Sequence, residues 1–228
     1  MMIALISDIH GNFPALRSVL AEIDALGAEE IICLGDVAGY YAQVDECVAE
    51  LKSRNIASLM GNHDFYLSTG RACDRSNSAN QCLDYQRSQL QPDTLAWLKV
   101  LPKVLVRSGM NMVHAGWRDP LEEYMSPSND YFSSFLETCF ASGHSHVQYV
   151  WQGETKTYCN PGSVGQPRDG DPRAAFALWD GCNFTLHRIA YDIDATAHEM
   201  RRAGFSPYFF DNLYKGSRIG GRIDSPPW

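Results

Sequence analysis

Three apolar segments in the first 64 residues each end in a small polar cluster, and this repeated pattern constrains the fold more than any other feature of the sequence. Residues 2–6 lead into Ser7-Asp8-Ile9-His10, residues 31–34 into Gly35-Asp36, and residues 56–60 into Gly61-Asn62-His63-Asp64. Amphipathic spacing between them predicts helices over residues 13–26 and 44–54. Strands that alternate with helices are typical of an α/β fold, in which ligands bind at the carboxyl ends of the strands. The pattern therefore predicts a ligand site built from these clusters.

After residue 64 the pattern of polar and apolar residues changes twice. Residues 65–101 are rich in polar side chains but keep helical spacing, which predicts a helical excursion that covers the site. From residue 102 onward apolar residues alternate, which predicts a largely antiparallel sheet. Its expected strands are residues 104–106, 111–113, 140–142, 147–151, 155–159, 176–179 and 184–187. We expect one domain over residues 1–203, ending in a helix, and then an aromatic, glycine- and proline-rich tail over residues 204–228.

Charge and hydropathy restrict the classes of partner. The net charge of −8 disfavours long nucleic acid and anionic membranes, although bound cations could reverse the sign locally for a small anionic substrate. No segment approaches the roughly 20 apolar residues of a membrane span, and the first residues lack the basic start of a signal peptide. We therefore expect a cytoplasmic protein, with the aromatic tail packed on the body or on a second subunit of a homo-oligomer.

The cysteines predict buried side chains rather than disulfides or a zinc site. There are seven, an odd number, and none forms a Cys-x-x-Cys pair. Strand-like contexts predict buried positions for Cys33, Cys139, Cys159 and Cys182. We expect only Cys73 and Cys82 near the surface.

Five of the seven histidines lie at the ends of expected strands. These are His10, His63, His114, His144 and His146, and they accompany Asp8, Asp36, Asn62 and Asp64. One histidine after a strand is ordinary, and Asp8 alone could cap the following helix, but such clustering indicates a metal site. Carboxylate, imidazole and amide ligands without thiolate suit manganese, iron, zinc or nickel. Two cations about 3.5 to 4 Å apart need a shared negative charge, for which Asp36 is the candidate.

Five short blocks, in this order and at these separations, resemble the calcineurin-like metallophosphoesterases. The blocks are Asp8-Ile9-His10, Gly35-Asp36, Gly61-Asn62-His63-Asp64, Val113-His114-Ala115-Gly116 and Gly143-His144-Ser145-His146. The resemblance extends from residue 2 to about residue 188, and residues 160–168 are similar to the small single-domain phosphodiesterases of bacteria and archaea. It implies a central two-sheet β-sandwich flanked by helices in four layers, with the metals at the carboxyl ends of the strands.

The resemblance also implies a ligand set and a mechanism. One ion would be held by Asp8, His10, Asp36 and His146, and the other by Asp36, Asn62, His114 and His144. Manganese is the expected metal for both divalent ions, with iron, zinc, nickel or cobalt as alternatives. A hydroxide bridging the two ions would attack phosphorus in line. His63 would contact the phosphate and assist the leaving oxygen, while Asp64 would fix the tautomer of His63.

Three residues outside the blocks are candidates for substrate contact, each with a structural alternative. Arg168 could clamp a phosphate, or it could pair with Asp169 or Asp171. Tyr40 could stack on the leaving group or merely pack. Asn12 could contact substrate, but capping the first helix is the favoured interpretation.

These features favour a two-metal hydrolase of phosphate esters, and specifically a phosphodiesterase that acts on a small molecule or nucleotide. A phosphomonoesterase or a dinucleoside polyphosphate hydrolase is the alternative within enzymes. A third hypothesis is a scaffold, because one branch of the resembled superfamily serves in the retromer and has lost catalytic residues. His63 and every candidate ligand are present here, which favours the enzyme.

Overall fold

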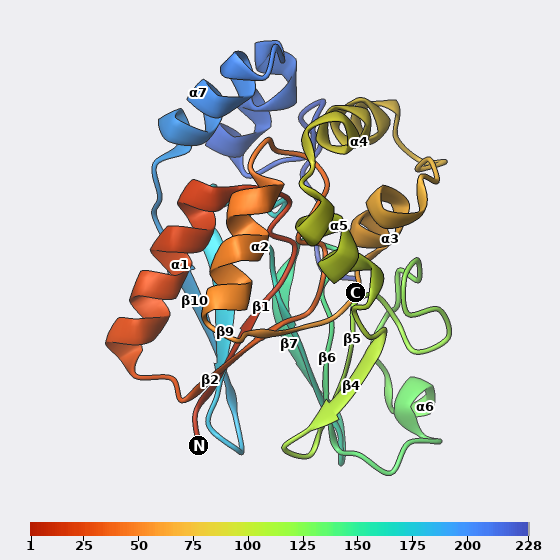
Figure 1. Ribbon diagram of the computed structural model, residues 1–228. Coiled ribbons are helices and arrows are strands. Elements are labelled where there is room, and N and C mark those ends of the chain that lie inside the picture. Colours follow the sequence, from red (N-terminus) through yellow and green to blue (C-terminus); the bar gives the residue numbers. More distant parts are fainter. Residues whose placement is uncertain (228) are drawn as a thin grey trace.

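The computed structural model describes residues 1–227, in which ten strands form two five-stranded sheets surrounded by helices (Figure 1). The first sheet contains, in spatial order, β10 (Phe184–Ile189), β9 (Ala174–Trp179), β1 (Ile3–Ile6), β2 (Glu30–Cys33) and β3 (Ala57–Ser58). The second contains β4 (Val104–Arg107), β5 (Met110–Val113), β6 (Cys139–Ala141), β8 (Thr157–Pro161) and β7 (Gln148–Gln152). The predicted α/β sandwich of two sheets flanked by helices is confirmed.

Strand β1 lies at the centre of the first sheet and is buried on both faces. Its successive side chains point to opposite faces, as in any strand. Ile3 and Leu5 pack in a hydrophobic cluster with Met112 of the second sheet, whereas Ala4 and Ile6 belong to the larger cluster formed with the helices. Burial on both faces explains why this strand is a continuous apolar run rather than an alternating one.

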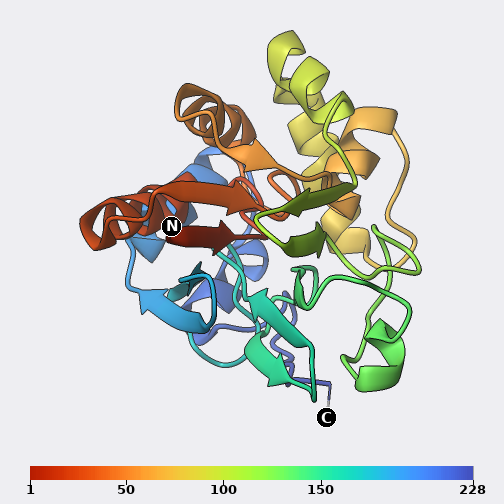
Figure 2. The ribbon, with the colours of Figure 1, turned by 90° about the horizontal axis from the view of Figure 1, so that it is seen from below.

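The helices lie around the two sheets. They are α1 (Phe13–Leu26), α2 (Val44–Ser53), α3 (Asn62–Thr69), α4 (Asn77–Gln89), α5 (Pro92–Lys99), α6 (Asn129–Phe132) and α7 (Ile193–Arg202). Helices α1 and α2 lie beside β1 and β2, while α4 and α7 lie at the upper end in Figure 1. The view from below shows the helices of residues 62–99 gathered together and away from α6 (Figure 2).

The prediction of a largely antiparallel second half is wrong for two pairs of strands. β6 pairs in parallel with both β5 and β8, whereas the edge strands pair in antiparallel fashion, β4 with β5 and β7 with β8. The β9–β10 hairpin leaves this sheet altogether and pairs with β1. Alternating hydrophobicity specifies which side chains are buried but not the direction or identity of the partner strand. The long connection over residues 114–138 allows the parallel β5–β6 pairing.

The predictions are also wrong for three cysteines: Cys73 and Cys82, which were expected near the surface, are buried, and Cys182, which was expected to be buried, is exposed. Cys73 is 6% exposed and Cys82 is 1% exposed, because both pack in the cluster between the helices and the first sheet. Cys182 lies in the turn between β9 and β10 and is exposed. The three other cysteines predicted to be buried in strands, Cys33, Cys139 and Cys159, are buried.

The segment after α7 packs on the body of the protein. It forms two short 3₁₀ helices, η1 (Pro207–Phe209) and η2 (Asp211–Lys215), and the side chains of Phe210 and Leu213 are buried in the cluster that contains α1. The chain then turns toward the carboxyl ends of the strands. Within residues 1–227, no helix is both long and apolar enough to cross a membrane.

Candidate metal centre

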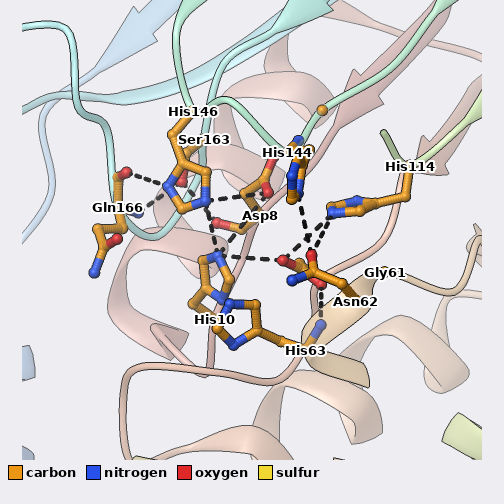
Figure 3. Close-up of polar contacts among 12 residues, drawn as sticks. Asp8, His10, Gly61, Asn62, His63, His114, His144, His146, Ser163 and Gln166 are labelled. Atoms are coloured by element: carbon orange, nitrogen blue, oxygen red, sulfur yellow. Dashed lines mark hydrogen bonds and ion pairs between the residues drawn. The ribbon is translucent and has the colours of Figure 1, made fainter. Parts of the chain in front are cut away.

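The polar clusters predicted at the strand ends converge at one place between the two sheets (Figure 3). They come from the loops after β1 (Asp8, His10), β2 (Asp36), β5 (His114) and β6 (His144, His146), and from the first turn of α3 (Asn62, His63). None of these side chains is more than 6% exposed. Both sheets therefore contribute to a single buried site that is rich in imidazole and carboxylate groups.

Five of the candidate ligands have a left-handed backbone conformation. The φ angles are 54° at Asp8, 53° at His10, 55° at Asp36, 64° at His144 and 59° at His146. This conformation costs roughly 1–2 kcal/mol for a residue with a Cβ atom, and the described residues hold only two other non-glycine examples. Strain gathered at one place is typical of a functional site, where the surrounding structure imposes it.

Two glycines allow the ligand loops to approach one another closely. A Cβ atom on Gly61 would lie 2.0 Å from Oδ1 of Asp36, and one on Gly143 would lie 2.0 Å from Oγ of Ser7 and 2.6 Å from Oδ2 of Asp8. Real Cβ contacts of this length do not occur, so no side chain fits at either position. These glycines explain why a glycine precedes the ligand residue in two of the sequence blocks.

In the first group of ligands, lone pairs face one another. Nδ1 of His10 lies 2.8 Å from the carbonyl oxygen of Ala38, and Nδ1 of His146 lies 2.7 Å from that of Gln166. A carbonyl can only accept, so each Nδ1 carries the proton and each Nε2 presents a lone pair. The two Nε2 atoms are 3.0 Å apart, and burial keeps the pKa of both rings well below the ordinary value. Oδ1 of Asp8, 3.3 Å from Nε2 of His146, has no hydrogen-bond partner in the described structure.

The second group of ligands surrounds the side-chain amide oxygen of Asn62. Oδ1 of Asn62 lies 3.1 Å from Nε2 of His114 and 3.1 Å from Nδ1 of His144. Nδ1 of His114 is 2.9 Å from the carbonyl oxygen of Leu34, so in the neutral ring, the form that binds a metal, Nε2 presents a lone pair. Nε2 of His144 is buried and has no hydrogen-bond partner among the described residues. In the neutral ring, Nε2 of His114 and Oδ1 of Asn62 are both acceptors, buried and 3.1 Å apart, an arrangement that fits a cation between them.

Asp36 belongs to both groups. Its Oδ2 lies 3.4 Å from Nε2 of His114 and 3.7 Å from Nε2 of His10, while its Oδ1 accepts from the backbone N–H of His63 at 2.8 Å. The two sets in which all ligand atoms lie within 4.8 Å of one another are Asp8, His10, Asp36 and His146, and Asp36, His114 and His144. Although burial opposes protonation of His114, the Asp36 carboxylate raises its pKa to about 9. The same negative charge attracts metal cations, so the donor set fits divalent ions.

The imidazole of His63 lies beside the first group rather than in it. Its ring centroid is 5.0 Å from that of His10 and 4.9 Å from that of Tyr40, and its Nδ1 is buried without a hydrogen-bond partner in the described structure. The predicted contact with Asp64 is wrong. The Asp64 carboxylate instead accepts from the backbone N–H groups of Ala38 at 2.8 Å and Gly61 at 3.0 Å, which joins the loops after β2 and β3.

Arg168 lies against the site and is only 4% exposed. The predicted alternative, a pair with a neighbouring aspartate, is wrong, because Asp169 pairs with Arg188 and Asp171 with Arg173. Oε1 of Gln166 accepts from Nε of Arg168 at 3.0 Å and from its Nη2 at 2.6 Å. The guanidinium also lies over the ring of Tyr40, at 5.5 Å. Gln166, which the sequence analysis did not single out, therefore holds Arg168 in place.

The structure does not bring Asn12 to the site. Its Oδ1 accepts from Ala15 N–H at 3.3 Å and from Thr196 Oγ1 at 2.8 Å, and its Nδ2 donates to the carbonyl oxygen of Gly165 at 2.8 Å. The side chain is fully buried. Asn12 is a helix cap that also joins α1 to α7, so the prediction of substrate contact is corrected.

A cavity of about 420 Å³ opens over the ligand groups. Side chains that the sequence analysis did not assign to the site line it together with Tyr40, His63 and Arg168, namely Tyr66, Arg75, Glu122, Tyr124, Arg218 and Arg222. They come from the helical excursion, from the connection between β5 and β6, and from the C-terminal segment. Residues 65–101 were expected to cover the site, but no local pattern predicts the contributions of the β5–β6 connection and of the C-terminal segment, which reach the cavity only through the tertiary fold.

Comparison with known proteins agrees with this architecture. Residues 1–183 match the Calcineurin-like phosphoesterase superfamily domain, so the chain belongs to this superfamily of metal-dependent phosphoesterases. Protein MJ0912 of Methanocaldococcus jannaschii is 32% identical over 240 residues, covering 94% of this chain and 98% of that protein. Phosphodiesterase YfcE of Escherichia coli K12 is 28% identical over 191 residues, covering 79% and 88%. A metallophosphoesterase structure from Sphaerobacter thermophilus matches with a TM-score of 0.81 at 32% identity, covering 95% and 99%.

Proposed function

We propose that this chain is a two-metal-dependent hydrolase of phosphate esters and that its preferred substrates are phosphodiesters. The observation that carries the proposal is the pair of buried ligand groups that share the Asp36 carboxylate. A carboxylate between two cation sites offsets the repulsion between the cations. A protein that held one structural ion would not need a second group of unpaired acceptors beside the first.

The proposed ligands follow the two groups. The first ion is assigned to Asp8, His10, Asp36 and His146, and the second to Asp36, Asn62, His114 and His144. Nitrogen and oxygen ligands without thiolate support manganese as the activating metal, with iron, zinc, nickel or cobalt as substitutes. Bound there, divalent ions would supply charge to neutralise phosphoryl oxygens and would lower the pKa of water.

The surrounding residues have separate roles in this proposal. Arg168, which lines the cavity, binds a phosphoryl oxygen through Nη1, the guanidinium nitrogen that does not bond to Gln166. Burial lowers the pKa of His63, so its ring is neutral before substrate binds. An anionic phosphate beside the ring would raise that pKa, and the imidazole could then hold a proton for the leaving oxygen. Tyr40 packs against both His63 and Arg168 and keeps them oriented.

Two features support a diesterase rather than a scaffold. The acceptors of both groups and His63 are all present and buried, and a scaffold would have no need to retain them. The relative YfcE, 28% identical, is described as a phosphodiesterase. Phosphomonoesters and dinucleoside polyphosphates are the competing substrates within the enzyme hypothesis.

Hydrolysis of bis(p-nitrophenyl) phosphate tests the proposal. We expect turnover with manganese, little turnover after chelation, and loss of turnover in Asp8→Asn. The matched control is Asp24→Asn, which removes a carboxylate on α1 that is 56% exposed and paired only at the surface. No rate above buffer with manganese, nickel, cobalt or zinc would contradict the enzyme hypothesis. Parallel assays with p-nitrophenyl phosphate and a dinucleoside tetraphosphate rank the alternatives.

A further inference from the structure

The C-terminal segment, residues 216–227, forms one wall of the metal cavity, although the match to the superfamily domain ends at residue 183. Arg218 and Arg222 of this segment line the same cavity as Asp36, His63 and Arg168. The segment thus adds two cationic side chains to a site whose ligands all lie within the superfamily domain. Side chains that vary outside a shared catalytic core are the usual source of substrate selection.

The segment is held against the site by specific contacts. The backbone N–H of Asp224 donates to the carbonyl oxygen of Arg168 at 2.7 Å, and that of Arg218 donates to the carbonyl oxygen of Arg222 at 2.8 Å. The Asp224 carboxylate accepts from Nε of both arginines. One carboxylate therefore orients two guanidinium groups and neutralises only one of them.

Both guanidinium groups keep donors available for a ligand. Within residues 1–227, the η nitrogens of Arg218 and Arg222 have no hydrogen-bond partner, and the side chains are 31% and 69% exposed. The planar fork of an arginine matches two oxygens of a phosphate, which makes arginine a preferred phosphate ligand. The surplus positive charge also counteracts the overall charge of −8 at the cavity.

A second cavity of about 400 Å³ lies directly beyond these arginines. Tyr124, His144, Arg218 and Arg222 line both cavities, and the rest of the second cavity combines apolar and aromatic side chains such as Met125 with polar ones such as Glu123 and Asn160. Its volume is in the range that accepts a small organic group. A ligand that extends from the metal centre into this cavity lies beside the residues that both cavities share, two of which are these arginines.

We propose that Arg218 and Arg222 bind a second phosphate on the substrate, so that the enzyme selects phosphate esters whose organic group carries a further phosphate. This inference rests on the proposed function, because it places the reacting phosphorus at the metal centre. The organic group lies in the second cavity, and the second phosphate lies at the boundary between the two cavities.

Two chromogenic esters that differ by one phosphate test the inference. They are the p-nitrophenyl ester of thymidine 5′-phosphate and the same ester carrying a 3′-phosphate. We expect the wild type to have the higher kcat/KM for the bisphosphate ester, and Arg218→Gln or Arg222→Gln to lower the ratio of the two values about tenfold. Arg202→Gln, which removes an arginine of α7 that is 68% exposed, is the control and keeps the ratio.

The outcomes separate the two proposals. An unchanged ratio in both variants, or a wild type without preference, overturns the recognition by arginine. If neither these esters nor bis(p-nitrophenyl) phosphate is hydrolysed, the proposed function fails, and calorimetry with thymidine 5′-phosphate and thymidine 3′,5′-bisphosphate then decides the inference. Tighter binding of the bisphosphate by about tenfold, lost in Arg218→Gln, supports it, and equal affinities overturn it.

Discussion

The Gln166 side chain fixes Arg168 in the cavity, so we predict that Gln166→Met impairs substrate binding although residue 166 touches no metal ligand through its side chain. Its Oε1 accepts from two guanidinium nitrogens at 3.0 and 2.6 Å, and its Nε2 donates to the hydroxyl of Tyr41 at 3.1 Å. Methionine has a similar length and removes all three contacts. The backbone carbonyl of residue 166, which accepts from His146, remains.

The structure sets the size of the effect. Hydrogen bonds to a charged group contribute about 1.5–3 kcal/mol each, and the buried Arg168 has no carboxylate partner among the described residues. A substrate phosphate recovers part of this loss when it binds the guanidinium. We therefore expect kcat/KM for bis(p-nitrophenyl) phosphate to fall about ten- to hundredfold, equivalent to about 1.4–2.8 kcal/mol, with unchanged metal content.

A double-mutant cycle shows whether Gln166 acts through Arg168. If it does, Gln166→Met costs little more in a background of Arg168→Ala, because the group that it orients is already missing. The cycle is read from kcat/KM for the four proteins, with elemental analysis of each as the control for the metal site. Losses that multiply in the double variant would refute this reasoning.

Further predictions concern the other parts of the site. His63→Ala should keep both metals but slow hydrolysis, most strongly for esters with poor leaving groups, and an equal loss on all esters would assign His63 to phosphate binding alone. Gly143→Ala should lower metal content and thermal stability, because its Cβ meets Ser7 and Asp8, and wild-type values for both would contradict the close packing. Chelation should lower the Tm measured by calorimetry, since buried acceptors then lose their cation, and an unchanged Tm would mean that no ion is bound.

The convergence of the sequence blocks could be predicted because they lie at the ends of central strands. Asp8 and Asp36 follow strands β1 and β2, which are adjacent and parallel, so two short segments place their ends together. His146 is 138 residues away from Asp8 in the sequence. It reaches the same site because it follows β6, which belongs to the sheet packed against the first. Hydrophobic patterning predicts where the strand before Asp8 and the strand before His146 end. The packing of the two sheets against each other then brings these two ends together.

The contacts that sequence did not predict depend on loops and on long-range packing. Asp64 was expected to orient His63, but its carboxylate accepts from two backbone N–H groups. The spacing of apolar residues in the sequence does not predict a contact of this kind. Cys82 was expected near the surface, but the tertiary packing of α4 buries it. The arginines of the C-terminal segment reach the cavity only because the chain returns to it after α7.

Metal content measured together with activity shows whether Asp36 serves two metal ions. Wild-type protein loaded with manganese and freed of excess metal should hold about two ions per chain by elemental analysis. Asp36→Asn should hold fewer and lose hydrolysis of bis(p-nitrophenyl) phosphate, while Asp24→Asn should match the wild type. Undiminished metal content in Asp36→Asn, or a single ion in the fully active wild type, would contradict the account.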